Sequence, residues 1–184
     1  MIAVVVAFAS VVAMASAFCL DPKTAANFNV KLMLGGWHQV YTNELTYAWL
    51  EENTVCIQAH YGVNANGTVS VNNTALVGGV QSSQVYQILG WAAASKPQYP
   101  AELTVSLQGV PLPAPLWWLA TSSNATGRYE WAVGSDPLCA TLFVITRDYP
   151  IPKTYLPAID AALATHGWKR KDLVEITWAG CSFP

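Results

Sequence analysis

Four cysteines are the residues of this 184-residue chain that could do chemistry most readily. They could bind a metal, attack a substrate or pair as disulfides, and they stand at Cys19, Cys56, Cys139 and Cys181. Zinc sites use closely spaced Cys-x-x-Cys pairs, which these positions do not form, so we expect no metal site. An even number of cysteines in a secreted chain favours two disulfides, and four cysteines allow three different pairings.

No other group of reactive side chains has the spacing of a catalytic site. His38, His60 and His166 are scattered along the chain, without a Ser-His-Asp order or a pair of carboxylates. His166 falls at the end of an expected helix, where a cation suits the helix dipole. We therefore expect no catalytic residues and no cofactor.

The N-terminal segment indicates secretion. Residues 2–13 are apolar but too short to span a bilayer, which takes about 20 residues. Ala15-Ser16-Ala17 matches the pattern at which signal peptides are cleaved. We expect a signal peptide at 1–17 and one extracellular domain at 18–184; the alternative is a segment retained as an anchor.

The charge composition gives no sign of a nucleic-acid partner. Only 11% of the residues are charged, the formal net charge is −2, and Lys169-Arg170-Lys171 is the single basic run. A nucleic-acid-binding surface needs a basic patch, which this composition does not supply. No later apolar stretch is long enough for a membrane span, so we expect a soluble mature protein.

Three Asn-x-Ser/Thr sequons mark candidate glycosylation sites. They begin at Asn66, Asn72 and Asn124. In a eukaryotic secreted protein such sequons carry glycans on surface loops.

Alternation of apolar and polar residues predicts eight short strands. They cover 36–46, 54–61, 68–77, 81–93, 101–109, 116–121, 128–133 and 140–147. After Pro150 the spacing becomes helical, which predicts a helix over about 155–166 and a last strand over 173–178. Eight strands at such intervals are typical of an all-β sandwich or barrel.

Gly35-Gly36-Trp37 heads the first strand and indicates how a barrel would be closed at one end. The glycines allow a close approach of backbones, and the indole plugs the cylinder. The expected inner faces carry Tyr, Trp, Phe and Val rather than charges. An eight-stranded barrel lined in this way has room for one small apolar ligand.

Four stretches of the sequence then match a known family. They are Phe28-Asn29-Val30 with Leu34-Gly35-Gly36-Trp37, residues 56–61 followed by Asn66-Gly67, residues 114–121, and residues 143–147. With these stretches the chain resembles the lipocalin family, and within it the group of apolipoprotein D and its bacterial relatives. The resemblance implies an eight-stranded antiparallel up-and-down barrel with one C-terminal α-helix and a short final strand.

The resemblance also implies covalent and structural roles. It implies two disulfides, Cys19–Cys139 and Cys56–Cys181. It places Arg147 over the indole of Trp37 at the closed end, where a cation–π contact stabilises the barrel floor. One stretch departs from the family pattern: the turn after the sixth strand reads Thr121-Ser122-Ser123 and lacks the usual acid, so the loop up to Gly127 is expected to differ.

Strand alternation selects the first candidate ligand contacts. If Trp37 faces the interior, then alternation points Gln39 and Tyr41 inward as well. If Arg147 faces the interior, the same rule points Phe143 inward. These three side chains are expected to contact a ligand.

Further candidate contacts come from the resemblance and from the aromatic residues. The resemblance places Tyr61 and Asn73 in the lumen. Trp118, Tyr129 and Trp91 are aromatic candidates whose orientation the pattern leaves open. For each aromatic residue the alternative is plain core packing.

The function that these observations favour is that of a secreted carrier. We expect a small hydrophobic ligand in the barrel, such as a fatty acid, steroid, retinoid or pigment, and the sequence indicates no particular receptor or lipid surface. One alternative is a lipocalin-type enzyme acting on a lipid or pigment, which would need a nucleophile or an acid inside the barrel; a free, reactive thiol would favour it. Another is an interaction module with an immunoglobulin-type sandwich, for which a Cys56–Cys139 disulfide would be expected.

Overall fold

The computed structural model describes residues 19, 21–123 and 125–183. The expected signal peptide at 1–17 and the sequon at Asn124 lie outside the described residues. Within those described ranges, no helix combines the length and apolarity needed to cross a membrane.

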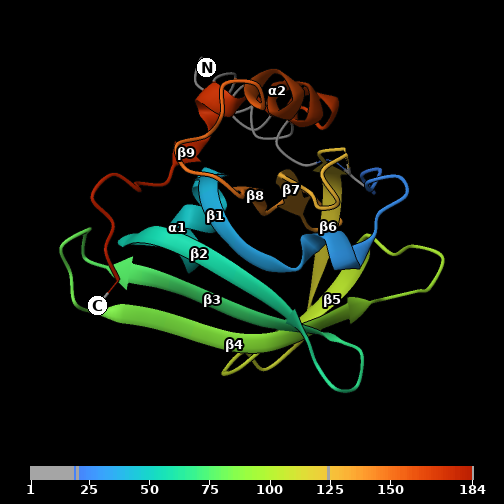
Figure 1. Ribbon diagram of the computed structural model, residues 1–184, viewed down its shortest axis with the longest axis horizontal. Helices are drawn as coiled ribbons and strands as arrows, with labels where there is room; N and C mark the ends of the chain where they lie inside the picture. The colour runs from blue at the N-terminus through green and yellow to red at the C-terminus, as the bar shows by residue number, and fades with distance from the viewer. Residues whose placement is uncertain (1–18, 20, 124, 184) are drawn as a thin grey trace, which may run out of the picture.

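Eight antiparallel strands form a closed up-and-down barrel, which confirms the predicted fold class (Figure 1). Each strand pairs with the next, and β1 closes the barrel because it pairs with both β2 and β8. The strands are β1 (Gly35–Thr42), β2 (Thr54–Val63), β3 (Val69–Val77), β4 (Val85–Ala94), β5 (Glu102–Leu107), β6 (Ala114–Thr121), β7 (Trp131–Ser135) and β8 (Leu142–Thr146). The closed barrel replaces the sandwich alternative.

Helical and short elements flank the strands. A 3-10 turn η2 (Val30–Met33) precedes β1, and α1 (Glu44–Leu50) follows it. After the barrel come α2 (Leu156–Thr165), η3 (Arg170–Asp172) and β9 (Val174–Glu175), which pairs with β1. The predicted helix is confirmed nearly to its ends, whereas the predicted last strand is much shorter.

The helix α1 corrects the prediction of a continuous strand over 36–46. Asn43 ends β1 and caps the helix, since its side-chain oxygen accepts the Thr46 N–H at 3.2 Å. Side chains of Asn, Asp, Ser and Thr at this position satisfy N–H groups that a helix start leaves free. Glu44 in the first turn also suits the helix dipole.

The up-and-down order divides the connections between two ends of the barrel. Because successive strands run in opposite directions, residues 43–53, 78–84, 108–113 and 136–141 all lie at one end. We call these the mouth loops. The loops 64–68, 95–101 and 122–130 lie with η2 at the other end, which we call the floor.

Apolar side chains pack on both sides of the barrel wall. Inside, an interior cluster includes Trp37, Tyr61, Val71, Trp118 and Ile145. Outside, α2 covers the wall with Ile159 and Leu163, which are fully buried against residues of β1, β7 and β8. Residues that alternate along these strands therefore serve two separate cores.

Both disulfides that the resemblance implied are confirmed. Cys19 pairs with Cys139 and Cys56 with Cys181, at Cα separations of 5.3 Å and 5.8 Å. The first joins the N-terminal lead-in to a mouth loop, and the second joins the C-terminal tail to β2. The Cys56–Cys139 pairing expected for a sandwich is not formed, and all four cysteines are bridged.

Candidate ligand-binding site

A guanidinium stacked on an indole closes the floor of the barrel. Trp37 is 1% exposed, and its indole N–H donates to the Met33 carbonyl at 2.7 Å. The central guanidinium carbon of Arg147 lies 3.7 Å from the centroid of the Trp37 ring. Gly35 adopts φ +98°, and a Cβ at this position would come within 3.2 Å of the guanidinium. Glycine is therefore favoured here by its conformation, and a side chain would also press on the guanidinium.

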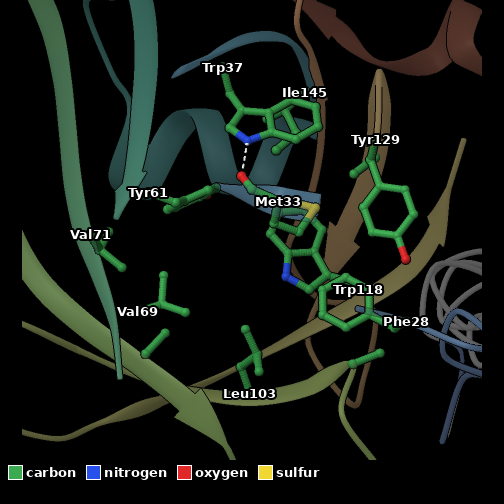
Figure 2. Close-up of a cluster of buried hydrophobic side chains, with 13 residues drawn as sticks. Phe28, Met33, Trp37, Tyr61, Val69, Val71, Leu103, Trp118, Tyr129 and Ile145 are labelled. Carbon is green, nitrogen blue, oxygen red and sulfur yellow. Dashed lines mark hydrogen bonds between the residues drawn. The ribbon is translucent and has the colours of Figure 1, made fainter. Parts of the chain in front are cut away.

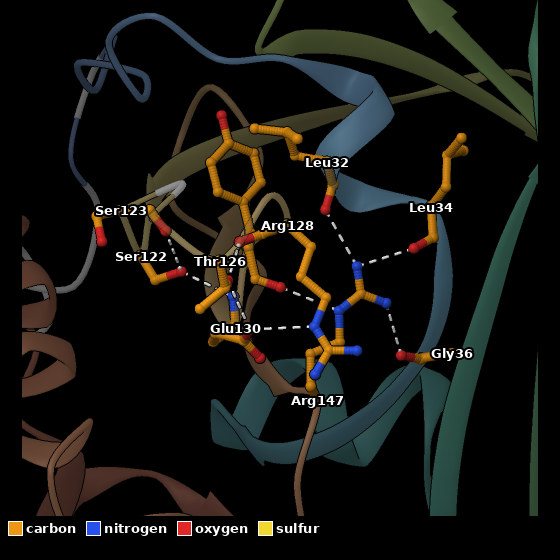
Figure 3. A network of polar contacts seen from close by, with 10 residues as sticks. Leu32, Leu34, Gly36, Ser122, Ser123, Thr126, Arg128, Glu130 and Arg147 are labelled. Carbon is orange, nitrogen blue, oxygen red and sulfur yellow. Dashed lines mark hydrogen bonds and ion pairs between the residues drawn. The ribbon is translucent and has the colours of Figure 1, made fainter.

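The same guanidinium joins several floor segments by four hydrogen bonds (Figure 3). It donates to the carbonyls of Leu32 at 3.1 Å and Leu34 at 2.8 Å, just before β1. It also donates to the carbonyls of Gly36 at 2.8 Å and Tyr129 at 3.0 Å. Burial lowers the pKa of Arg147 to about 10, so the group stays charged near neutral pH. Arg147 thereby fastens η2, β1 and the loop 122–130 to β8.

A second polar network holds the loop that departs from the family pattern (Figure 3). Glu130 accepts hydrogen bonds from Arg128 at 3.0 Å and Thr126 at 2.8 Å. The Ser122 hydroxyl accepts the N–H of Glu130 at 2.7 Å, so a serine anchors this turn. Burial raises the pKa of Glu130, but the hydrogen bonds outweigh burial and the pKa falls below its ordinary value.

Above the floor, apolar side chains from six elements enclose a small cavity (Figure 2). Its free volume is about 10 Å³, which is room for about one water molecule. Val30 and Met33 of η2 border it together with Tyr61, Val71 and Trp118 from the wall. Any ligand larger than water must therefore displace side chains here.

Toward the mouth the inner face of β4 becomes exposed. Ala92 of β4 belongs to the interior cluster, and alternation places Tyr86 of the same strand on the same face. Tyr86 is nevertheless 49% exposed. The barrel is thus sealed at the floor and accessible to solvent along β4 at the mouth, whereas Gln39 and Thr42 of β1 are buried.

Three of the candidate aromatic residues lie together in the interior. Tyr61 and Trp118 border the cavity, with ring centroids 6.3 Å apart in an edge-on arrangement. Phe143 meets the Trp118 ring edge-on at 5.7 Å. Burial raises the pKa of Tyr61, so its hydroxyl is neutral and can donate a hydrogen bond.

Two polar candidates also face inward. Gln39 lies opposite Ile145, a member of the interior cluster, and its amide N–H donates to the Glu51 carboxylate at 2.7 Å. Asn73 lies between Ala59 of β2 and Ile88 of β4. Its side-chain oxygen is buried and has no hydrogen-bond partner within the described chain.

Tyr41 does not face the interior, which corrects the alternation predicted from Trp37. The pairing of β1 with β8 shifts between Gln39 and Tyr41, so a bulge at Val40 reverses the alternation. Tyr41 belongs to the outer cluster beneath α2, and the guanidinium of Arg170 lies 5.8 Å from its ring.

Tyr129 and Trp91 lie away from the cavity. The Tyr129 ring stacks on Phe28 at 5.8 Å, and its hydroxyl accepts the Asn29 N–H at 3.0 Å. Tyr129 is therefore part of the floor. Trp91 precedes the inward-facing Ala92, points outward and is 43% exposed.

Two of the sequons lie on the outside of the barrel. Asn66 is exposed in the β2–β3 turn and accepts the Thr68 N–H at 3.1 Å. Asn72 faces outward beside the inward-facing Asn73, and its side chain accepts a hydrogen bond from Gln87 at 3.0 Å. Glycosylation at these positions stays a prediction.

Glu51 is a site residue that sequence reasoning missed. It follows the last turn of α1 and reaches Gln39 inside the barrel. The signal that could have found it is the capped helix start, Asn43 followed by Glu44, because a seven-residue helix then places Glu51 at its end.

Comparison with known protein families and sequences agrees with this geometry. The family model described as a lipocalin-like domain matches residues 28–177. Apolipoprotein D of Rattus norvegicus is 34% identical over 133 residues, covering 65% of this chain and 67% of that protein. Apolipoprotein D of Mus musculus is 34% identical over 103 residues, covering 56% and 51%. The chain thus spans about two thirds of the length of the Rattus norvegicus protein and about half of the length of the Mus musculus protein.

Solved structures show the same fold at low sequence identity. Insecticyanin from the tobacco hornworm Manduca sexta has a TM-score of 0.67 at 17% identity, with 90% of this chain and 89% of that chain covered. The tryptamine complex of the amine-binding protein of Rhodnius prolixus has a TM-score of 0.63 at 14% identity, with 91% of each chain covered.

Proposed function

This chain belongs to the lipocalin family, and from that premise we propose that it is a secreted protein that binds and transports a small hydrophobic ligand. The observation that carries the proposal is an apolar barrel interior sealed at the floor by Trp37 and Arg147 and open at the mouth. Burying apolar ligand surface there contributes about 25 cal/mol per Å². The two disulfides and the signal-like segment at 1–17 support secretion.

In this proposal the apolar body of the ligand lies against Tyr61, Trp118 and Phe143. Gln39 and Asn73 supply polar groups that orient it. Because the free volume above the floor is only about 10 Å³, the ligand enters by displacing side chains. Met33 is suited to this because its unbranched, flexible side chain can repack.

One of the similar solved structures supports a small ligand in the barrel. The structure of the Rhodnius prolixus amine-binding protein is that of a complex with tryptamine, a small molecule with an aromatic body. We infer that this chain uses its barrel in a comparable way.

Fluorescence titration of the recombinant mature chain tests the proposal. Trp118 lies beside the cavity, so a bound fatty acid, steroid, retinoid or pigment should quench tryptophan emission and saturate. Ala92→Phe places a ring inside the barrel, whereas Ala93→Phe places one on the opposite face of β4. Ala92→Phe should weaken binding at least tenfold and Ala93→Phe less than twofold. Equal effects of the two variants, or no saturable quenching by any compound, would contradict the proposal.

A further inference from the structure

Glu51 brings a carboxylate from the mouth into the barrel. One of its oxygens accepts the Gln39 amide N–H at 2.7 Å, while the other, Oε2, is buried and has no partner among the described residues. Burial raises the pKa of Glu51, and the nearby polar side chains of Gln39 and Thr42 offset only part of that effect. The Thr42 hydroxyl itself donates to the Leu142 carbonyl at 3.0 Å, so it does not occupy Oε2. Thr42 lies opposite Phe143 and Gln39 opposite Ile145, so both neighbours of Glu51 belong to the inner face of the wall.

The local structure holds this carboxylate in place. The backbone N–H of Glu51 donates to the Tyr47 carbonyl at 3.0 Å, and the Thr54 hydroxyl donates to the Glu51 carbonyl at 2.6 Å. At the other end of α1, Asn43 donates to the Ala140 carbonyl at 2.8 Å. Glu51 is therefore fixed between the end of α1 and the start of β2.

Among the residues that the structure describes, no cation pairs with this carboxylate. The ion pairs of the described residues involve Glu130, Asp160 and Asp172, not Glu51. The mouth loops contain no Lys, Arg or His. They carry four acidic residues, Glu44, Glu51, Glu52 and Asp136.

Four basic side chains lie at the opposite end of the barrel, whereas Arg170 lies outside the wall beside Tyr41 and pairs with Asp160. Lys31, Lys96 and Arg128 belong to the floor segments, and Arg147 closes the floor itself. The charged side chains of the mouth loops are therefore all negative, which favours a cation over an anion among them.

We propose that Glu51 binds the protonated amine of an amphiphilic ligand whose apolar body lies in the barrel. The ammonium group donates to Oε2 of Glu51, the oxygen that the chain leaves without a donor, while Gln39 holds the other oxygen. The inference rests on the proposed function, because it assigns the polar end of the same ligand. It excludes fatty acids as preferred ligands, since their carboxylate would meet that of Glu51.

Three probes with the same ten-carbon chain test this assignment: decylamine, decanol and decanoate, titrated by tryptophan quenching at pH 7. The wild type should bind decylamine at least tenfold more tightly than decanol, and decanoate most weakly. Glu51→Gln keeps the side-chain shape, and it should bring the amine-to-alcohol ratio to within twofold of one without weakening decanol. Glu52→Gln removes one charge from an exposed neighbour and should change the ratio less than twofold.

The outcomes separate the two proposals. Equal binding of the three probes by the wild type overturns the assignment of Glu51 and leaves the carrier function standing. A preference for the amine that is unchanged in Glu51→Gln also overturns the assignment of Glu51 and leaves the carrier function standing. If none of the probes, and none of the hydrophobic panel above, binds the wild type, the carrier function itself fails. The ratio measured in the wild type needs no variant, so the test holds even if Glu51→Gln folds poorly.

Discussion

At the scale of single residues, Arg147 has the largest expected effect on stability. Arg147→Ala removes the cation–π contact with Trp37 and four hydrogen bonds to carbonyl groups at the floor, of which the Leu32 carbonyl still accepts the Tyr129 N–H. We expect a loss of about 3 kcal/mol, or roughly 6–12 °C in Tm for a domain of this size. Thermal unfolding followed by circular dichroism measures this effect.

Two comparisons make the Arg147 prediction specific. Arg147→Lys keeps the charge but not the planar group with its several donors, so it should restore less than half of the loss. Arg128→Ala removes an exposed floor arginine and should cost under 1 kcal/mol. Ligand affinity in Arg147→Ala should fall less than threefold at a temperature where the variant is folded. A large loss of affinity with unchanged Tm would contradict a structural role.

Glu51 should make stability depend on pH in a particular direction. Its pKa in the folded protein is raised above the ordinary value of 4.5. The folded state therefore holds the proton more tightly than the unfolded chain, and the free energy of unfolding falls as pH rises from 4.5 through the folded pKa. Glu51→Gln removes this penalty, so the variant should be more stable than the wild type at pH 8, by about 1–2 kcal/mol. The gain should disappear near pH 4, and urea unfolding at both pH values measures it.

The orientation of side chains could be predicted only where a strand is regular. The inward orientation predicted for Gln39 and Phe143 agrees with their pairing partners, because alternation holds up to those positions. Tyr41 was placed wrongly because one extra residue at Val40 reverses the alternation, and a bulge leaves no composition signal in this stretch. Glu51 contributes its carboxylate from outside the strands, where alternation gives no information.

At the scale of elements, α1 depends on its cap. Asn43 accepts hydrogen bonds from the N–H groups of Thr46 and Leu142 and donates to the Ala140 carbonyl. Asn43→Ala should cost about 1–2 kcal/mol, because it removes the helix cap and the contact with a neighbouring mouth loop. Hydrogen exchange should become at least tenfold faster across Glu44–Leu50.

Hydrogen exchange in other parts of the chain serves as the control for the prediction on Asn43→Ala. β3 is paired with β2 on one side and β4 on the other, so its amides should be protected as in the wild type. Ser83→Ala, in another mouth loop, should leave the exchange of α1 unchanged. Uniformly faster exchange in Asn43→Ala would indicate global destabilisation and would contradict a local role of the cap.

The regular elements could be predicted from sequence, and the short ones could not. Alternation and the hairpin signal Asn66-Gly67 locate the eight strands, and Gly67 takes the left-handed conformation expected there, with φ +83°. α1 was missed because its apolar residues, including Trp49 and Leu50, are exposed and form no buried face. β9 is only two residues long, and Ile176 and Trp178 beyond it belong to a separate cluster with Cys56.

At the scale of the whole molecule, the two disulfides connect segments far apart in sequence. Cys56 and Cys181 are 125 residues apart, so their bond restricts the unfolded chain strongly. The double variant Cys56→Ala/Cys181→Ala should lose about 2–5 kcal/mol in the free energy of unfolding, measured with urea. Trp178 packs beside this bridge, so its emission should shift to the red before the main transition. A single coincident transition would contradict early release of the tail.

The volume available to a ligand is a property of the whole molecule that sequence reasoning did not provide. The expected interior surface is apolar, and it is apolar in the structure. The free space above the floor, however, depends on how Met33 and Trp118 fill the centre of the barrel, and their shared packing has no sequence signal. The resemblance to the lipocalin family predicts a ligand-binding cavity but not the volume of that cavity.

The bridge between Cys19 and Cys139 fixes where the chain begins in space. Cys139 belongs to a mouth loop, so residue 19 is held at the entrance while the lead-in continues to the floor, where Phe28 stacks under Tyr129. An affinity tag or fusion partner attached ahead of Cys19 would thus lie near the mouth of the barrel, where it would slow the entry of the ligand. Association rates measured before and after such a tag is removed would reveal this obstruction.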